Sequence, residues 1–249
     1  KILVEKVIRA LLLLEGLVKQ EIQFVFKGGT ALMLHFNSTK RLSIDIDIIL
    51  QKENNEFEDK LNALAKEQGF IRKELQHRNT NSISKKQHYK FFYTPIHKSN
   101  KTEDYILLDI LFENQNYQNI IQSQIQSVFV PIIDNPLWVN IPSLEDILGD
   151  KLTAFAPNTT GIPYQKSGNS MSMEIIKQLY DIGNLFDSIN DLNRIKTTFY
   201  KFAKTTLAYR NIKELNEQNV LKDIYQTSLC IASRGMDGTG NFEELQLGI

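Results

Sequence analysis

The chain has 249 residues, of which 42% are hydrophobic and 23% charged, a balance that excludes global disorder and is enough for one large or two small domains. There are 29 basic residues (lysine plus arginine) and 29 acidic residues (aspartate plus glutamate). This balance excludes an overall positive field that would bind nucleic acid or anionic membranes indiscriminately. Cys230 is the only cysteine, so an intramolecular disulfide and a cysteine zinc cluster are excluded, as fits a reducing cytoplasm.

The N-terminal segment predicts a helix, because residues 2–19 carry apolar positions at helical spacing. Its apolar run over residues 10–14 is much shorter than the roughly 18 residues that span a bilayer, so we expect no membrane association. A short strand is expected over residues 22–26, and a compact apolar helix over residues 31–36, after a Gly-Gly turn.

The middle of the chain alternates between strand and helix character, and everything after Pro142 has the pattern of helices. The further elements that we expect are a strand at 43–50, a helix at 55–68 and strands at 70–76, 88–95 and 104–112. Ser143 and Asp146 have the spacing of a helix cap, and a Gly/Ser/Asn-rich loop is expected over residues 157–172. We therefore predict an α+β fold, with a mixed-sheet domain at residues 1–140 and a helical domain at residues 141–249.

Two carboxylates share one face of the strand expected at residues 43–50. Side chains alternate along a strand, so Ser43, Asp45 and Asp47 lie on the face opposite the apolar residues. Two aspartates about 6.5–7 Å apart on one strand face repel each other unless a cation lies between them. Their hard oxygen atoms suit Mg²⁺ or Mn²⁺; the alternative is an exposed strand face that carries two carboxylates by chance.

A Gly-Gly turn lies ahead of this strand, in Lys27-Gly28-Gly29-Thr30. Glycine permits close approach to the backbone, and the start of the following helix offers N–H groups to a phosphate. A plain turn is the alternative for this feature taken alone, but its position before a strand with two carboxylates favours a phosphate site.

Asp109 is the only charged residue in the apolar stretch at residues 105–112. A buried carboxylate is costly unless it is paired or bound to a metal, so we expect Asp109 to join Asp45 and Asp47 at a metal ion. The alternative is a carboxylate at a sheet edge, or one bonded to a nearby lysine.

The order Gly-Gly-Thr, Asp-x-Asp and a later single Asp resembles the nucleotidyltransferases of the DNA polymerase β superfamily. More narrowly, residues 27–32 together with Arg41-x-Ser43-x-Asp45-x-Asp47 resemble the AbiEii-type toxins of abortive-infection and type IV toxin–antitoxin systems. Later in that family come a helical lysine, matched by Lys151, and a Lys-Asp-x-x-Asp helix, matched by residues 177–181 with Gln178 in place of the first Asp. The resemblance covers roughly residues 24–186.

This resemblance implies a polymerase β-like fold, a Mg²⁺- or Mn²⁺-dependent transfer of a nucleoside monophosphate from a nucleoside triphosphate, and a cognate antitoxin. It implies that Asp45, Asp47 and Asp109 bind the metal and, with Lys151, carry catalysis. tRNA is the preferred acceptor, and a protein hydroxyl is the alternative. The residues expected to bind the nucleotide are Lys27, Gly28, Gly29, Thr30, Ser43, Lys151, Lys177 and Asp181.

Lys151 also stands out without the resemblance, because it falls within the apolar stripe of its helix and must find a partner there. A lysine that extends from the edge of the core to water is the alternative. Lys177 and Asp181 are four residues apart and fall outside the apolar stripe of their helix, so a surface ion pair is the alternative to nucleotide binding.

Residues 72–101 combine many basic residues with aromatic ones, a mixture that suits RNA. The alternative is the solvated face of an antiparallel sheet. The basic residues are Arg72, Lys73, Arg78, Lys85, Lys86, Lys90, Lys98 and Lys101, and the aromatic ones are Tyr89, Phe91, Phe92 and Tyr93.

Two competing functions remain at this level. A glycosyltransferase also uses Asp-x-Asp to bind a sugar nucleotide through a metal, but this chain has no Rossmann-type start. A catalytically idle nucleotide-binding regulatory protein is the second, because Gln178 replaces the family's Asp and no clear Arg lies in the loop before it.

Overall fold

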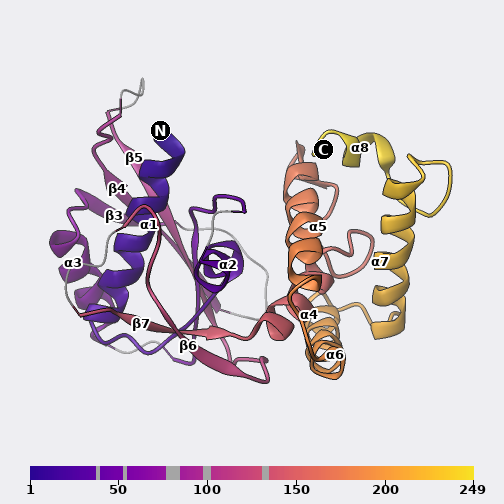
Figure 1. The fold of residues 1–249 in the computed structure, drawn as a ribbon, viewed down its shortest axis with the longest axis horizontal. Helices are drawn as coiled ribbons and strands as arrows, with labels where there is room; N and C mark the ends of the chain where they lie inside the picture. The colour runs from indigo at the N-terminus through magenta and orange to yellow at the C-terminus, as the bar shows by residue number, and fades with distance from the viewer. Residues whose placement is uncertain (38–39, 53–54, 77–84, 98–101, 131–134) are drawn as a thin grey trace. The chain divides into compact units, whose positions relative to one another are not determined.

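The computed structural model describes residues 1–37, 40–52, 55–76, 85–97, 102–130 and 135–249. The chain divides into two compact units. One, here called the strand unit, comprises Lys1–Gln115 and Ile120–Pro142; the other, the helical unit, comprises Asn116–Asn119 and Ser143–Ile249. Figure 1 labels most of their elements, and the predicted α+β class is confirmed.

The strand unit is built on a five-stranded mixed sheet with the order β1-β2-β5-β4-β3. β2 and β5 are parallel, and the other neighbouring pairs are antiparallel. The strands are β1 (Val25–Lys27), β2 (Ile46–Leu50), β3 (Arg72–Leu75), β4 (Lys85–Tyr93) and β5 (Asp104–Phe112). All five strands overlap strands expected from the sequence; β5 has the expected bounds, and the other four are shorter or displaced.

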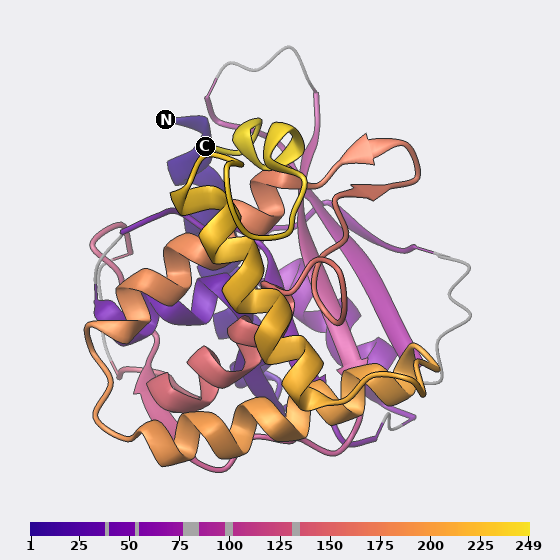
Figure 2. The ribbon, with the colours of Figure 1, turned by 90° about the vertical axis from the view of Figure 1, so that its right-hand side faces the viewer.

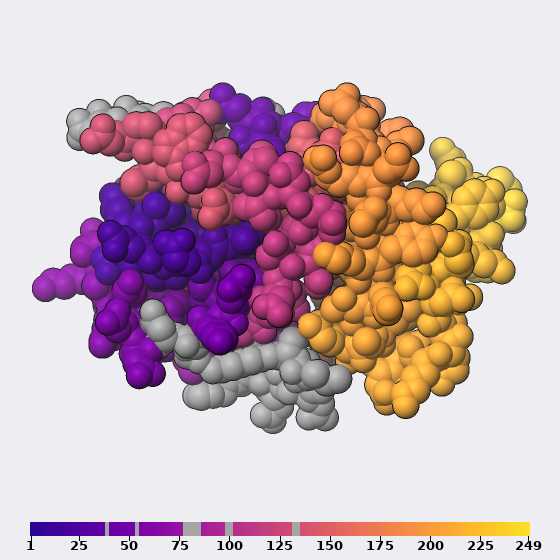
Figure 3. Space-filling model, turned by 90° about the horizontal axis from the view of Figure 1, so that it is seen from below, coloured from indigo at the N-terminus to yellow at the C-terminus, as the bar shows by residue number. Residues whose placement is uncertain are grey.

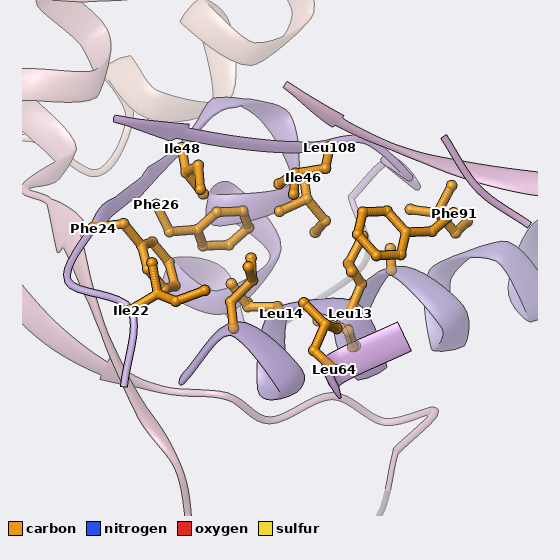
Figure 4. Packing of buried hydrophobic residues seen from close by; sticks show 14 of the residues in the cluster. Leu13, Leu14, Ile22, Phe24, Phe26, Ile46, Ile48, Leu64, Phe91 and Leu108 are labelled. Carbon is orange, nitrogen blue, oxygen red and sulfur yellow. The ribbon is translucent and has the colours of Figure 1, made fainter. Parts of the chain in front are cut away.

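The hydrophobic core of the strand unit covers one face of this sheet. Leu13 and Leu14 of α1 (Ile2–Lys19) and Leu64 of α3 (Phe57–Glu67) belong to one buried cluster with side chains of the sheet (Figure 4). Those sheet residues are Phe26, Ile46, Ile48, Phe91 and Leu108. Each such side chain contributes roughly 1.5–3 kcal/mol when fully buried, so this face fixes which residues point the other way.

Three more elements complete the strand unit. α2 (Gly28–Phe36) follows β1 without a loop, and its buried residues Ala31, Met33 and Leu34 join the same core. β6 (Ile120–Gln124) and β7 (Trp138–Pro142) form a separate antiparallel pair.

The helical unit has its own core, which includes Phe155, Ile175, Phe199 and Val220. Its helices are α4 (Leu144–Ala154), α5 (Ser172–Phe186), α6 (Leu192–Tyr209), α7 (Glu217–Ala232) and α8 (Phe242–Gln246), shown in Figure 2. The predicted cap is confirmed, because the Ser143 side chain accepts a hydrogen bond from the Asp146 backbone N–H. In the part of the chain that the structure describes, no helix combines the length and the apolar character needed to cross a membrane.

The loop expected over residues 157–172 contains a small hairpin, which the sequence did not predict. β8 (Gln165–Lys166) pairs with β9 (Asn169–Ser170), and the turn residues Ser167 and Gly168 have φ values of 51° and 78°. Positive φ at both central residues is the geometry of a two-residue hairpin turn, which a serine-glycine pair does not specify as strongly as Asn-Gly does.

Candidate functional site

The turn between β1 and α2 packs directly against the carboxylate of Asp47. Gly28 has φ +81°, a left-handed conformation that favours glycine, and a Cβ atom at this position would overlap Oδ2 of Asp47. The first turn of a helix has backbone N–H groups without partners inside the helix. The sequence therefore brings a carboxylate and the start of α2 together at one glycine.

A row of four residues runs across the sheet at this level. Asp47 of β2 is paired with Lys27 on one side and with Asp109 on the other, and Asp109 is paired with His88 of β4. The neighbouring residues Ile46, Ile48, Leu108 and Ile110 are buried in the core. Because side chains alternate, the row Lys27, Asp47, Asp109 and His88 lies on the opposite face of the sheet.

Asp45 lies just before β2, so the prediction that both aspartates belong to one strand is wrong for Asp45. β2 begins at Ile46, because β1 ends at Lys27, opposite Asp47, and the chain then turns into α2. The backbone carbonyl of Asp45 instead accepts a hydrogen bond from the Thr30 hydroxyl of α2, at 2.6 Å. The Thr30 side chain thus holds the residue before β2 in place, and the expected role of the Thr30 backbone N–H toward a phosphate is separate from this contact.

Asp109 is paired with a histidine and is not fully buried. Its side chain is 32% exposed, and its Oδ1 lies 2.7 Å from Nδ1 of His88, whose side chain is 13% exposed. The assumption that the Asp109 carboxylate is buried is therefore wrong, while its expected part in a metal site stays a prediction. Half of the residues around Asp109 in β5 face away from the core, and Asp109 is among them.

Arg41 and Ser43 gather at the second glycine of the turn. A Cβ atom built on Gly29 would lie 2.5 Å from a guanidinium nitrogen of Arg41 and 2.8 Å from the Ser43 hydroxyl. A guanidinium beside the start of a helix is well suited to an anionic oxygen such as that of a phosphate. Arg41 was part of the sequence motif but not of the predicted nucleotide-binding residues, and the structure places its guanidinium beside one of them, Gly29.

The chemistry of this region suits a divalent cation. Asp47 and Asp109 are neighbours in register on one face and supply hard carboxylate oxygen atoms, the donors that Mg²⁺ prefers. Within the ranges described above, no three or more side chains of the His, Cys, Asp and Glu types form a group that could hold a metal ion. The fit therefore rests on the Asp47 and Asp109 pair, with Asp45 two residues away in the chain.

The later motif residues lie in the helical unit, where Lys151 of α4 is paired with Asp181 of α5. The ammonium of Lys151 is 2.8 Å from Oδ2 of Asp181, with side chains that are 8% and 4% exposed, and it also donates to Gln178 Oε1 at 3.1 Å. The expectation that Asp181 lies away from the buried side of its helix is wrong. Lys177 is 3.9 Å from Glu174 on the exposed side.

The aromatic rings of the segment at residues 72–101, all on the described strand β4, do not form the stacking surface that the composition suggested. Tyr89, Phe91 and Tyr93 are buried in the core, because β4 is a central strand with one face against α1 and α3. Phe92 is covered by the Arg72 guanidinium, 3.5 Å from the ring centroid. These four rings are therefore not arranged to stack on bases.

Several basic groups of the segment are paired with acids. Arg72 bonds to Glu74 and, at 2.8 Å, to Glu103, and the hydrogen bond with Glu103 is the main cause that raises its pKa. Lys73 is paired with Glu58 of α3. Arg78, Lys98, Lys101 and the side chain of Lys85 lie outside the described residues.

Solved structures with a similar chain trace exist at low sequence identity. An antigenic nucleotidyltransferase-like protein from Paracoccidioides brasiliensis is 15% identical, with a TM-score of 0.50 and 97% of each chain covered. JHP933 from Helicobacter pylori is 18% identical, with a TM-score of 0.47, over 93% of this chain and 91% of that one. No curated protein sequence matches the chain.

The sequence pattern of a known family matches nearly the whole chain. The match covers residues 12–233, and the family is described as "Nucleotidyl transferase AbiEii toxin, Type IV TA system". It includes the Gly28 turn, the carboxylates of β2 and β5, and the Lys151 and Asp181 pair. The chain therefore belongs to the AbiEii family of nucleotidyl transferase toxins of type IV toxin–antitoxin systems.

Proposed function

We propose that this nucleotidyltransferase uses Mg²⁺ and transfers a nucleoside monophosphate from a nucleoside triphosphate to a hydroxyl of an RNA, preferably tRNA, with release of pyrophosphate. It acts in the cytoplasm under the control of a cognate antitoxin. The observation that carries the proposal is the Gly28 turn against Asp47, in register with Asp109. We assign catalysis by the carboxylates to the strand unit, and the predicted domain at residues 1–140 is part of this proposal.

The triphosphate binds at the start of α2 in this proposal. Backbone N–H groups of Gly28, Gly29 and Thr30 face its oxygen atoms, and Arg41 and Ser43, which lie at Gly29, add a charge and a hydroxyl. Lys27, next to Asp47 in the sheet, supplies a second positive charge. Positioning and charge neutralisation of this kind are the main contributions that a protein makes to phosphoryl transfer.

The carboxylates supply the metal ligands and the base in this proposal. When bound, Mg²⁺ would be held by Asp45, Asp47 and Asp109 and would neutralise charge that develops on the phosphate oxygens. Of the two carboxylates in the row of paired residues, Asp109 lies farther from the Gly28 turn, and we assign it to accept the proton of the acceptor hydroxyl. The hydroxyl oxygen then forms a bond to the α-phosphorus as the bond to pyrophosphate breaks.

Lys151, Lys177 and Asp181 are also assigned to the nucleotide in this proposal. The Asp181 carboxylate, 2.8 Å from the Lys151 ammonium, holds that ammonium in one orientation. Gln178 accepts from the same ammonium without adding a second negative charge, so Lys151 retains more of its attraction for phosphate than it would between two aspartates.

The RNA acceptor is supported by α6 rather than by residues 72–101. Residues 192–213 contain six basic residues and no acidic one, in a chain whose total charge is zero. A groove of about 530 Å³ along α6 is lined by Lys196, Lys201 and Lys204 together with Tyr200 and one acidic residue, Glu217. The surface of α6 is visible in orange in Figure 3. Lysines spaced along a groove beside an aromatic ring suit a nucleic-acid backbone.

Incubation of the protein with Mg²⁺, total tRNA and each α-labelled nucleoside triphosphate in turn tests the proposal. We expect label on RNA, and we expect Asp47→Asn and Asp109→Asn each to lower the rate about 1000-fold, since several kcal/mol of charge stabilisation are lost. Asp187→Asn removes an exposed carboxylate of the helical unit and serves as the control for charge alone.

The same assay tests the acceptor. Replacement of Lys196, Lys201 and Lys204 by Gln should raise the KM for RNA and reduce its salt dependence, whereas replacement of the exposed Lys52, Lys166 and Lys222 should not. Label on protein instead of RNA would show a protein hydroxyl as acceptor. Triphosphate binding without any labelled product would favour an idle nucleotide-binding protein.

A further inference from the structure

His88 is the one member of the row across the sheet that no sequence motif indicated. It lies on β4, directly opposite Asp109 of β5, and its Nδ1 is 2.7 Å from Asp109 Oδ1. The His88 side chain is 13% exposed, so its ring is held by its surroundings and does not move freely in water. The contact is therefore a defined feature of the sheet face that carries the carboxylates.

The position of this contact in the row gives it a specific effect. Asp109 has Asp47 as its neighbour in β2 and His88 as its neighbour in β4. A hydrogen bond to Oδ1 restricts rotation of the Asp109 carboxylate and fixes where Oδ2 points. It also offsets part of the repulsion between two carboxylates on adjacent strands, whose Cα atoms are separated by about 5 Å.

We propose that His88 is a positioning residue that orients the Asp109 carboxylate for the divalent cation, and this inference rests on the proposed function of Asp109. His88 donates through Nδ1 to Oδ1, so that Oδ2 remains available to the cation. Hydrogen bonds that orient ligating carboxylates commonly change metal affinity by about 10- to 100-fold when they are removed.

A purely structural role makes a different prediction. Cross-strand pairs stabilise a sheet by about 0.2–1 kcal/mol, and such a pair would alter unfolding without altering how the protein binds a cation. Asn offers a donor atom at nearly the same distance from the backbone as His Nδ1, whereas Ala offers none. Comparison of these two substitutions therefore separates the lost donor from the lost ring.

The test is a titration of the full chain with Mn²⁺, followed by electron paramagnetic resonance, in His88→Ala, His88→Asn and the unchanged protein. We expect His88→Ala to weaken Mn²⁺ affinity about 10- to 100-fold and His88→Asn to recover most of it. His97→Ala is the matched control, because His97 Nδ1 also contacts a carboxylate, Glu5, at 3.1 Å, away from the carboxylate row.

Unfolding in urea, measured on the same proteins, shows whether each variant is folded. If His88→Ala does not fold, the Mn²⁺ affinity of His88→Asn still tests the inference. Unchanged Mn²⁺ affinity in a folded His88→Ala protein, with Asp109→Asn still losing affinity, would overturn the inference and leave the proposed function intact. Unchanged affinity in Asp109→Asn as well would overturn the proposed function itself. Loss of affinity in both His88 variants would exclude the Nδ1 donor as the cause.

Discussion

Gly28 is the residue on which the geometry of the proposed site depends most. Its φ of +81° disfavours any side chain, and the space where a Cβ atom would lie is taken by the Asp47 carboxylate. Gly168, in the β8–β9 turn, has a similar φ of +78° but nothing within 4 Å of its Cβ position. The two glycines therefore separate the cost of backbone conformation from the cost of a collision.

We expect Gly168→Ala to destabilise the protein by about 1–2 kcal/mol through its left-handed conformation alone. Gly28→Ala adds an overlap with Asp47 and should cost about 2–4 kcal/mol. Urea unfolding followed by far-ultraviolet circular dichroism measures both. Gly28→Ala should also reduce nucleotidyl transfer under conditions in which the variant is folded, because Asp47 must move, whereas Gly168→Ala should not. Equal unfolding costs for the two variants would contradict this account.

The residues of the site were partly predictable from local sequence. Gly28, Asp47 and Asp109 could be identified because a glycine pair before a strand and charges inside apolar strands are local signals. His88 could not be identified, since its role depends on which residue of β5 lies opposite it, and that register is a long-range property. The burial of Asp181 was missed for a similar reason, because its partner Lys151 lies on another helix.

At the scale of elements, bounds shifted where a neighbour determined them. The alternating pattern of residues 43–50 suggested a longer strand, but β2 begins at Ile46 because β1 ends opposite Asp47. The pattern of β4 gave a strand, yet it did not show that Tyr89, Phe91 and Tyr93 would be buried, because the aromatic residues are mixed with lysines along the sequence. Strand pairing, rather than composition, determines where β2 begins and which side chains of β4 are buried.

The contact between α4 and α5 includes a buried ion pair whose role can be measured. Lys151→Met leaves the Asp181 carboxylate buried without its cation, which should cost about 3–5 kcal/mol. Lys151→Met combined with Asp181→Leu replaces the pair by apolar groups and should recover most of that stability. Urea unfolding of the two single variants and the double variant measures the coupling between the residues.

The stabilised double variant also separates structure from chemistry. If Lys151 acts on the triphosphate, as proposed, the double variant should be folded and should have a raised KM for the nucleoside triphosphate. A double variant with both normal stability and normal transfer would show that the Lys151 and Asp181 pair only joins the two helices.

At the scale of the whole molecule, composition and periodicity predicted the order of strands and helices better than they predicted the residues of the site. The change from strand to helix patterns near Pro142 indicated an α+β chain, and the sheet and the helices that follow are present. The segment Asn116–Asn119, which groups with the helical unit, could not be predicted from its position in the sequence. Its attachment depends on Asp146, whose carboxylate accepts backbone hydrogen bonds from Gln118 and Asn119.

Ionisation of Tyr93 should lower the free energy of unfolding of the strand unit at alkaline pH. Burial, aided by the Asp104 and Glu5 carboxylates, raises the pKa of Tyr93 to about 12 from an ordinary value of 10.0. A raised pKa means that the folded state holds the phenol proton more tightly than the unfolded state does. This contribution to stability is complete below pH 10 and is lost as the pH rises toward about 12.

We expect the free energy of unfolding to fall by about 1.4 kcal/mol between pH 9 and pH 11 through this group alone, since one pKa unit corresponds to about 1.36 kcal/mol. Tyr93→Phe removes the ionisable group, so the difference in unfolding free energy between the variant and the unchanged protein should shift by that amount over the same interval. The single tryptophan, Trp138, lies on β7 of the strand unit, so its fluorescence follows the part of the chain that contains Tyr93. A difference that stays constant from pH 9 to pH 11 would show that Tyr93 ionises equally in the folded and unfolded states.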